Sequence, residues 1–307
     1  MSIDAVPAPG AGRRGALFGG RVQEAAMLLP ALALIAVFLL LPFLSSFRIA
    51  LTNERLIPRP VPPRFVGLDN FQSILSDHEF WVALWNVARF TLMVLPVQCG
   101  FALAVALILN TKLPFRNVFR GLFFLPAITS MVVVCVIWAT LFQYPTGPFN
   151  QILSVLSFGM AGPVDWLGDP RFAMPALVLL SAWQAYGFQM IVYLAGLQGI
   201  PESLYEAAEL DGANRWQRFW HVTMPSLRQT HIFVLIITTI QAFKLFTQVN
   251  ILTQGGPRGT TDTVVHYMFT AGFVNQRLGL ASAVAIILFF IVLIVSLVQR
   301  FVVRDRK

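Results

Sequence analysis

The chain contains 307 residues, of which 57% are hydrophobic and only 12% are charged. Soluble domains carry about 25% charged residues, so this chain cannot cover its apolar surface with water-facing groups, and we expect it to lie in lipid. The net charge of +8 does not indicate nucleic-acid binding, because the basic residues form short blocks between apolar runs rather than one stripe. Cys99 and Cys135 both lie inside apolar runs, which excludes a disulfide framework and a cysteine metal site.

Residues 1–24 are rich in Gly, Ala and Pro and are expected to form a flexible cytoplasmic tail. Gly10, Gly12 and Gly15 match G-x-G-x-x-G, but no strand pattern precedes them, so we expect no dinucleotide site. The apolar run that follows is too long for a signal peptide and lacks a cleavage site, which favours a retained membrane span. Residues 25–305 are expected to form a single membrane domain.

Six apolar segments are long enough to cross a bilayer. A hydrocarbon core of ~30 Å requires about 20 apolar helical residues. The expected spans are Ala25–Phe47, Leu84–Leu109, Phe119–Phe142, Phe172–Leu197, Gln229–Leu252 and Leu278–Val303. The predicted fold is therefore an all-α integral membrane protein with six transmembrane helices.

Basic residues determine the expected orientation. They are more numerous in the N-terminal tail, the loops after the second and fourth spans and the C-terminus than in the alternate loops. Because cytoplasmic loops carry the excess of Lys and Arg, both termini should be cytoplasmic, and so should the loop between the fourth and fifth spans.

That loop, Glu206–Leu227, is polar and helix-forming although it lies between two apolar spans. Gly212 would cost about 1 kcal/mol inside a helix, so we expect a break between two short helices there, or a contact point. Asp211 and Arg215 have the i, i+4 spacing of a helical ion pair, and Pro225 suits the first turn of the next helix. The alternative is an amphipathic helix that lies on the lipid headgroups.

The spacing of the loop is more specific than its composition. Glu206-Ala207-Ala208 is followed by three residues, Gly212, nine residues and then Val-Thr-Met-Pro. This pattern resembles the EAA loop of binding-protein-dependent ABC permeases, with Val222 and Met224 as conservative departures. Leu252–Pro257 is similar to the L-T-x-G-G-P signature of the carbohydrate-type branch, and Phe65–Phe71 is similar to its F-V-G-L-x-N-[FY] element.

The resemblance implies that the loop is a coupling helix that docks on a cytoplasmic ATPase. The residues that match the motif or lie within it are Glu206, Ala207, Ala208, Asp211, Gly212, Ala213 and Pro225. It also implies a second, homologous permease in a heterodimer, two ATPase subunits that bind ATP and Mg²⁺, and an external solute-binding protein. This chain would hold no cofactor and no metal, and it would lie in the bacterial inner (plasma) membrane as a multi-pass protein.

Polar residues inside the expected spans are candidates for the solute pathway, because such residues are expensive in lipid. Gln241, Lys244 and Gln248 have the i, i+3, i+7 spacing of one helix face and could bind hydroxyls, a phosphate or a carboxylate. Trp183 and Tyr186 could stack on a sugar ring. The alternative is that these groups connect the two permease subunits. The candidates are Gln184, Tyr186, Gln189, Gln241, Lys244, Gln248 and Asn250.

No catalytic set is visible in the sequence. The chain has no G-x-x-x-x-G-K-[ST] loop, and its four histidines are scattered without metal spacing. The leading hypothesis is therefore a non-enzymatic permease subunit of an importer for a sugar, an oligosaccharide, a polyol or a glycerol-phosphate solute. An ion-coupled secondary transporter is the alternative, although the spans contain almost no Asp or Glu. The missing catalytic set argues against a membrane-bound enzyme.

Overall fold

A computed structural model describes residues 27–57, 60, 62–111 and 114–304, with side chains described as far as Phe301. The expected N-terminal tail, residues 1–24, lies outside the described residues, and so does Lys112 in the loop after the second expected span. The described chain is helical, and its single strand-like contact is an isolated antiparallel bridge between Thr52 and Phe65.

The first helical run, Met27–Ala50, includes a π-helical turn and α2. The first half of the chain contains α2 (Leu41–Ala50), α3 (Asp69–Ser76), α4 (His78–Leu109), α5 (Arg116–Ile128), α6 (Met131–Leu141) and α7 (Pro148–Leu156). The second half contains α8 (Ala173–Gln198), α9 (Glu202–Leu210), α10 (Arg215–Arg218), α11 (Met224–Ser226), α12 (Arg228–Phe243), α13 (Val264–Phe269) and α14 (Leu278–Arg304). Further π-helical turns lie at Phe219–Thr223, Val249–Thr253 and Thr270–Val274.

Four described helices are long and apolar enough to span a bilayer: Met27–Ala50, α4, α8 and the Leu278–Phe301 part of α14. A fifth crossing exists if α5 and α6 count as one span, because these helices bend by 92° at the break between them. Pro126 cannot donate to the helical ladder, and α5 ends shortly after it, at Ile128. The chain is thus a membrane protein with several apolar helices.

The fifth expected span is interrupted in the structure. It begins as α12, a helix of 16 residues that ends at Phe243, and helical structure resumes only at Thr247. The hydroxyl of Thr263 donates to the carbonyl of Leu245 at 2.8 Å, so part of the broken segment is bonded by another part of the chain.

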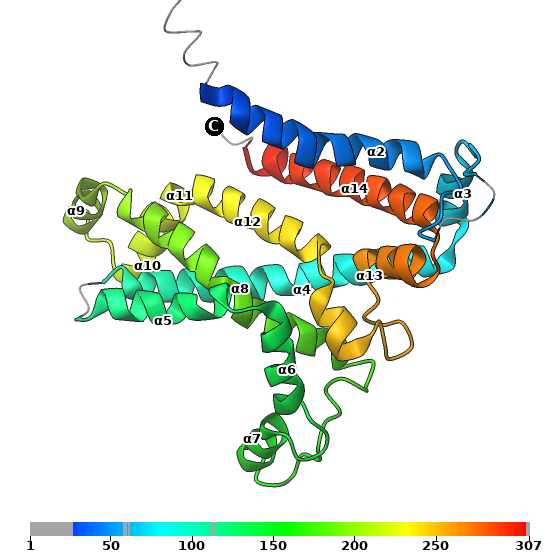
Figure 1. Cartoon of the computed structure of the whole chain (residues 1–307). Coiled ribbons are helices and arrows are strands. Elements are labelled where there is room, and N and C mark those ends of the chain that lie inside the picture. The colour runs from blue at the N-terminus through cyan, green and yellow to red at the C-terminus, as the bar shows by residue number, and fades with distance from the viewer. Residues whose placement is uncertain (1–26, 58–59, 61, 112–113, 305–307) are drawn as a thin grey trace, which may run out of the picture.

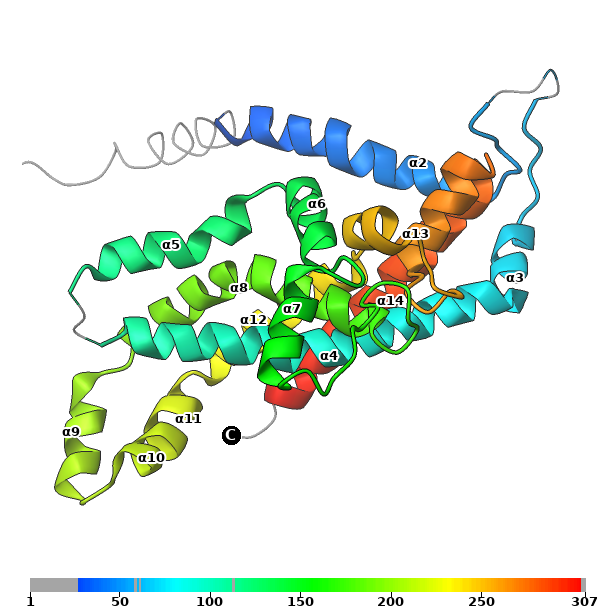
Figure 2. The same cartoon turned by 90° about the horizontal axis from the view of Figure 1, so that it is seen from below.

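The helices form an elongated bundle, from which α6 and α7 project to one side (Figures 1 and 2). The helix α2 packs along α14, and α4 makes its most extensive contact with α8. The α9–α10 loop, the start of α5, the beginning of the described chain and its C-terminal end all lie toward one end of this bundle (Figure 1). The segments α3 and α13 lie toward the other end. The α9–α10 loop and both ends of the described chain therefore share one end of the bundle.

The close approach of α8 to α5 depends on a glycine. A Cβ atom at Gly187 would lie 2.8 Å from the carbonyl oxygen of Phe123 and 3.1 Å from the Cα of Phe124. Only a residue without a side chain allows the two backbones to come this close. Both helices also form walls of one cavity, so their separation affects its width.

Candidate functional site

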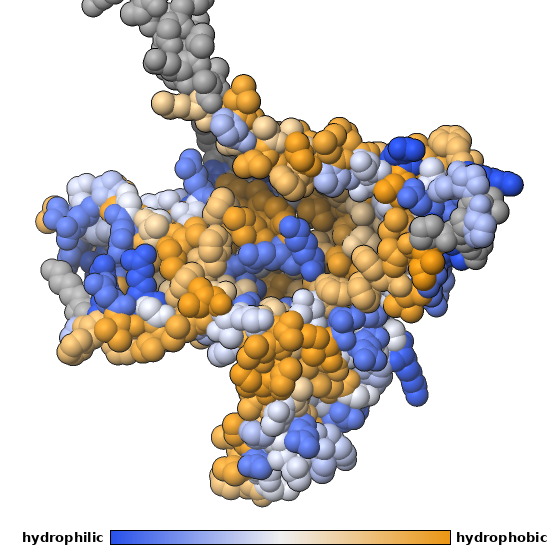
Figure 3. Space-filling view, viewed as in Figure 1, coloured by the Kyte–Doolittle hydropathy of each residue, from blue (hydrophilic) through white to orange (hydrophobic). Residues whose placement is uncertain are grey.

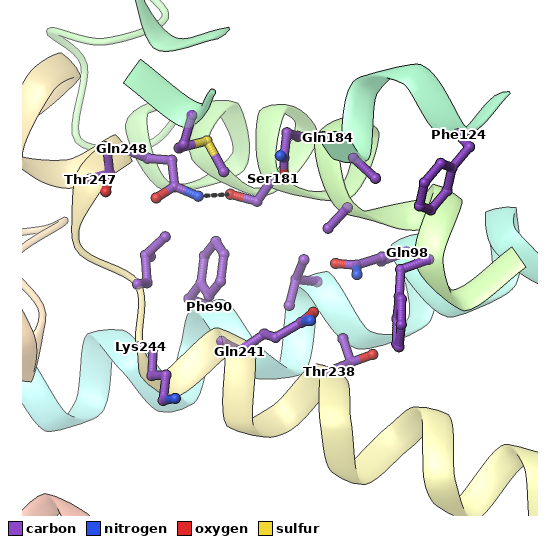
Figure 4. Close-up of a pocket in the computed structure, with 17 residues that line it drawn as sticks. Phe90, Gln98, Phe124, Ser181, Gln184, Thr238, Gln241, Lys244, Thr247 and Gln248 are labelled. Carbon is purple, nitrogen blue, oxygen red and sulfur yellow. Dashed lines mark hydrogen bonds between the residues drawn. The ribbon is translucent and has the colours of Figure 1, made fainter. Parts of the chain in front are cut away.

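A cavity of about 470 Å³ lies between α4, α8 and α12, with the α5–α6 bend along one wall. Figure 4 shows side chains from these helices arranged around it, and Figure 3 shows that the face seen in Figure 1 is hollowed, with hydrophilic surface inside an apolar rim. The polar lining residues are Gln98, Ser181, Gln184, Thr238, Gln241, Lys244, Thr247 and Gln248. The apolar lining includes three phenylalanines, Phe90, Phe124 and Phe188. A cavity that combines apolar walls with a few convergent polar groups is typical of a small-molecule site.

Hydrogen bonds fix several of the amide groups in and behind the cavity. Gln189, which is fully buried, donates from Nε2 to Thr238 Oγ1 and to Gln241 Oε1, both at 3.2 Å. Gln248 donates to Ser181 Oγ at 3.2 Å. These contacts join α8 to α12 and to the segment after it, so they hold the polar side of the cavity in place.

The amide of Gln98 has an unused donor. Its side chain is only 3% exposed, and its Nε2 has no hydrogen-bond partner in the described structure. A buried amide donor without a partner costs about 1–3 kcal/mol. Figure 4 shows the amide pointing between α8 and α12, where the cavity lies.

The break after α12 places Lys244 in the lining. The side chain is exposed, and no described carboxylate forms an ion pair with it. The i, i+3, i+7 argument assumed a continuous helix through Gln241, Lys244 and Gln248, whereas α12 ends at Phe243. All three side chains nevertheless line the cavity, because the segment after the break folds back around it.

The other expected pathway residues have different positions. Gln184 lines the cavity, whereas Gln189 lies behind its wall and donates a hydrogen bond to Gln241. Tyr186 is buried against Phe101, with ring centroids 4.7 Å apart, and does not line the cavity. Asn250 does not line it either.

The two rings considered for sugar stacking therefore do not lie in the cavity. Trp183 packs on Trp138, with ring centroids 5.5 Å apart. The aromatic rings in the lining are instead Phe90, Phe124 and Phe188. The sequence did not distinguish these three from the many lipid-facing phenylalanines. Ser181 did carry a usable signal, since it lies three residues before Gln184 and thus on the same helix face.

A second candidate site is the loop that contains α9, α10 and α11. The helix α9 ends at Leu210, Gly212 adopts φ +78°, and α10 begins at Arg215. The expected break at Gly212 is confirmed, because a positive φ strongly favours glycine. Pro225 lies in the first turn of α11, also as expected.

Local hydrogen bonds hold the second half of this loop. Asn214 accepts a hydrogen bond from the backbone N–H of Gln217 at 2.9 Å, and the Gln217 side chain accepts one from the backbone N–H of Asn214 at 2.8 Å. This capping box satisfies donors that the start of a helix leaves free. Across the break, Arg218 pairs with Glu209 at 3.1 Å. The described ion pairs do not include Asp211 with Arg215, because the turn at Gly212 interrupts the helical spacing.

The surface of the loop is accessible and partly apolar. Glu206, Ala207, Asp211 and Gly212 are exposed, while Ala208 and Ala213 are half-buried. Four large apolar side chains beside them are also exposed: Leu204, Leu210, Trp216 and Trp220. Leu210 is 90% exposed. Apolar side chains clustered on a polar loop outside the expected spans are typical of a protein-binding surface.

Comparisons with known proteins agree with the sequence motifs. A family profile described as "binding-protein-dependent transport system inner membrane component" matches residues 98–307. The chain is 36% identical to the arabinooligosaccharides transport system permease protein AraP of Bacillus subtilis, over 86% of this chain and 82% of that protein. It is 36% identical to the trehalose/maltose transport system permease protein MalF of Thermococcus litoralis, over 92% of this chain and 93% of that protein. Its fold is similar to a chain of a bacterial ABC transporter that imports the acidic polysaccharide alginate, with a TM-score of 0.80, 25% identity and coverage of 96% of this chain and 100% of that chain.

Proposed function

Since the chain belongs to the family of binding-protein-dependent transport system inner membrane components, within which its relatives are permeases of sugar ABC transporters, we propose that it forms one half of the pathway of an ATP-driven importer. The solute is a sugar or an oligosaccharide, or a related polyol or glycerol phosphate. The observation that carries the proposal is the exposed loop of α9–α11, which presents apolar side chains that nothing in the described chain covers.

The proposed topology has six membrane crossings and cytoplasmic termini. The crossings are the run Met27–Ala50, α4, the bent pair α5–α6, α8, α12 with the segment after its break, and α14. The α9–α10 loop, the start of α5 and both ends of the described chain share one end of the bundle (Figure 1), and the basic excess that the sequence places in these segments supports this orientation. The α9–α11 loop then faces the cytoplasm, where an ATPase can reach it. A bacterial inner membrane is the proposed location.

The proposed partners follow from this arrangement. A second, homologous permease completes the pathway, an external binding protein delivers the solute, and two cytoplasmic ATPase subunits bind ATP and Mg²⁺. Glu206, Ala207, Ala208 and the Asp211–Ala213 turn contact the ATPase, and Pro225 lies in α11, just before the helix α12 that leads back to the membrane. When the ATPases close, they move this loop and so change which side of the membrane the cavity faces.

The cavity is the proposed solute site within this chain. Gln184, Gln241, Lys244 and Gln248 contact the solute, and Gln189 positions Gln241. Amide groups suit a saccharide because each can donate to and accept from hydroxyls, and the phenylalanine walls can pack on the apolar faces of sugar rings. Nothing in the described lining suggests bond-making chemistry, and the role of this subunit is transport.

The test is ATPase activity of the complex purified in lipid, with the loaded binding protein present. We expect wild type to retain ATPase subunits and to show stimulated hydrolysis. The variants Glu206→Lys and Gly212→Asp should lose the stimulation or the ATPase subunits. The matched control is Asp69→Lys, which reverses an exposed carboxylate in α3, at the other end of the bundle, and should behave as wild type.

The opposite result would be clear. If no ATPase co-purifies and the two loop variants transport solute normally, the coupling assignment is wrong. An ion-coupled secondary transporter would then be the better description.

A further inference from the structure

Lys244 is a cation without a counter-charge in the described structure. It lines the cavity at the end of α12, and none of the ion pairs formed by the described residues includes it. A lysine ammonium at membrane depth is costly unless it faces water or a compensating group. The position of Lys244 therefore requires an anion or an aqueous pathway next to it.

The lining offers no anion of its own. Seventeen residues line the cavity, and none of them is Asp or Glu. The charge of the lining is therefore set by Lys244 alone. A solute with a negative group would find a complementary site, whereas a cationic solute would be repelled.

Amide side chains in the same lining present hydrogen-bond donors. Gln241 Oε1 already accepts from Gln189, so the Gln241 amide nitrogen is the group left to bind a ligand. Gln98 Nε2 also lacks a partner, but it is buried and lies away from Lys244 (Figure 4). The Lys244 ammonium and the Gln241 amide donor can bind the oxygen atoms of a carboxylate, sulfonate or phosphate, because hydrogen bonds to a charged acceptor are the stronger ones.

We propose that this cavity selects saccharides that carry an anionic substituent, with Lys244 as the residue that determines the selectivity. The inference rests on the proposed transport function and narrows its substrate class. The negative group binds Lys244 and the Gln241 amide, and the hydroxyls of the sugar ring bind the amides of Gln184 and Gln248. Lys244 thus favours an acidic sugar over its neutral counterpart, while the amides accept either.

The experiment compares two probes that differ in one group, methyl β-glucoside and methyl β-glucuronide. Binding to the intact complex in nanodiscs of zwitterionic lipid, without binding protein, is measured by saturation-transfer NMR, which detects weak ligands. We expect wild type to bind the glucuronide about tenfold more tightly than the glucoside, as for a hydrogen bond to a charged group. Lys244→Gln should abolish this preference and Lys244→Arg should keep it. Arg55→Gln, which removes one exposed positive charge from a loop residue outside the cavity lining, should also keep it.

Three outcomes would overturn the inference. The first is a wild-type protein that binds the two probes equally, which decides the matter even if Lys244→Gln prevents assembly. The second is a Lys244→Gln complex that keeps the full preference. The third is inorganic phosphate that binds as tightly as the glucuronide, since the site would then recognise a free anion rather than a saccharide. Failure of the transport function itself is a separate result, because it would appear as the absence of co-purified ATPase in the same preparations.

Discussion

The contact between α8 and α5 at Gly187 makes a strong test of how this bundle is packed. In Gly187→Ala the new Cβ would lie 2.8 Å from the Phe123 carbonyl oxygen and 3.1 Å from the Phe124 Cα. Both neighbours are backbone atoms, so no side chain can rotate away, and α5 must shift. Overpacking of this kind costs about 1–3 kcal/mol, whereas replacing glycine by alanine inside a helix gains about 0.5–1 kcal/mol. The net expectation is a loss of about 1 kcal/mol in stability.

Gly121→Ala in α5 is the matched control. Nothing lies within 4 Å of a Cβ built at Gly121, so this variant has only the helix-propensity gain. The assay is thermal unfolding of the purified complex in lipid, followed by binding of a sugar probe. We expect Gly187→Ala to unfold at a lower temperature than wild type and to bind the probe less well, because Phe124 and Ala127 of the shifted helix line the cavity. Equal unfolding temperatures for the two variants would refute the packing argument.

Three further predictions concern the loops. Gly212→Val should weaken retention of ATPase subunits in a pull-down, because a non-glycine residue at φ +78° costs about 1–2 kcal/mol. Gly212→Asn should have a milder effect, since Asn tolerates this conformation. If both variants lose the ATPase subunits equally, the cause is the added side chain rather than the backbone conformation. Asn214→Ala should remove the cap of α10 at a cost of about 1 kcal/mol and speed amide exchange in that helix, with unchanged exchange as the contrary result. Asn86→Ala should loosen the loop after Leu252–Pro257 and make it more sensitive to protease, because Asn86 Nδ2 donates to two loop carbonyls, those of Gly259 at 2.8 Å and Asp262 at 2.9 Å. Protease sensitivity that stays at the wild-type level would contradict this.

Much of the candidate site depends on contacts that the sequence does not display. Gln184 and Tyr186 both looked like pathway residues, yet only Gln184 lines the cavity. Residues two positions apart in an α-helix are separated by roughly 200° around its axis, so the side chains of Gln184 and Tyr186 must point in different directions. Only the neighbours of α8 decide which of these directions is the cavity. In the same way, Gln98 is distant in sequence from Gln241, and their proximity to one cavity is a result of how α4 and α12 pack.

The family, the apolar helical character and the polar loop Glu206–Leu227 can all be predicted from the sequence alone. These features are local: hydropathy is a sum over neighbouring residues, and the spacing from Glu206 to Pro225 can be read along the chain. The turn at Gly212 was predictable for the same reason, since its cause is the backbone freedom of one residue.

The tertiary structure alone decided where the long segments break and which polar groups meet. The segment after α12 leaves the helix although it contains no Gly or Pro, and there the Leu245 carbonyl accepts from Thr263, which is 18 residues further along the chain. Despite that break, Lys244, Gln241 and Gln248 line one cavity, in an arrangement that a continuous helix does not describe. Backbone groups that a helix leaves free must find partners elsewhere, and which partner is in reach depends on the packing of the whole bundle.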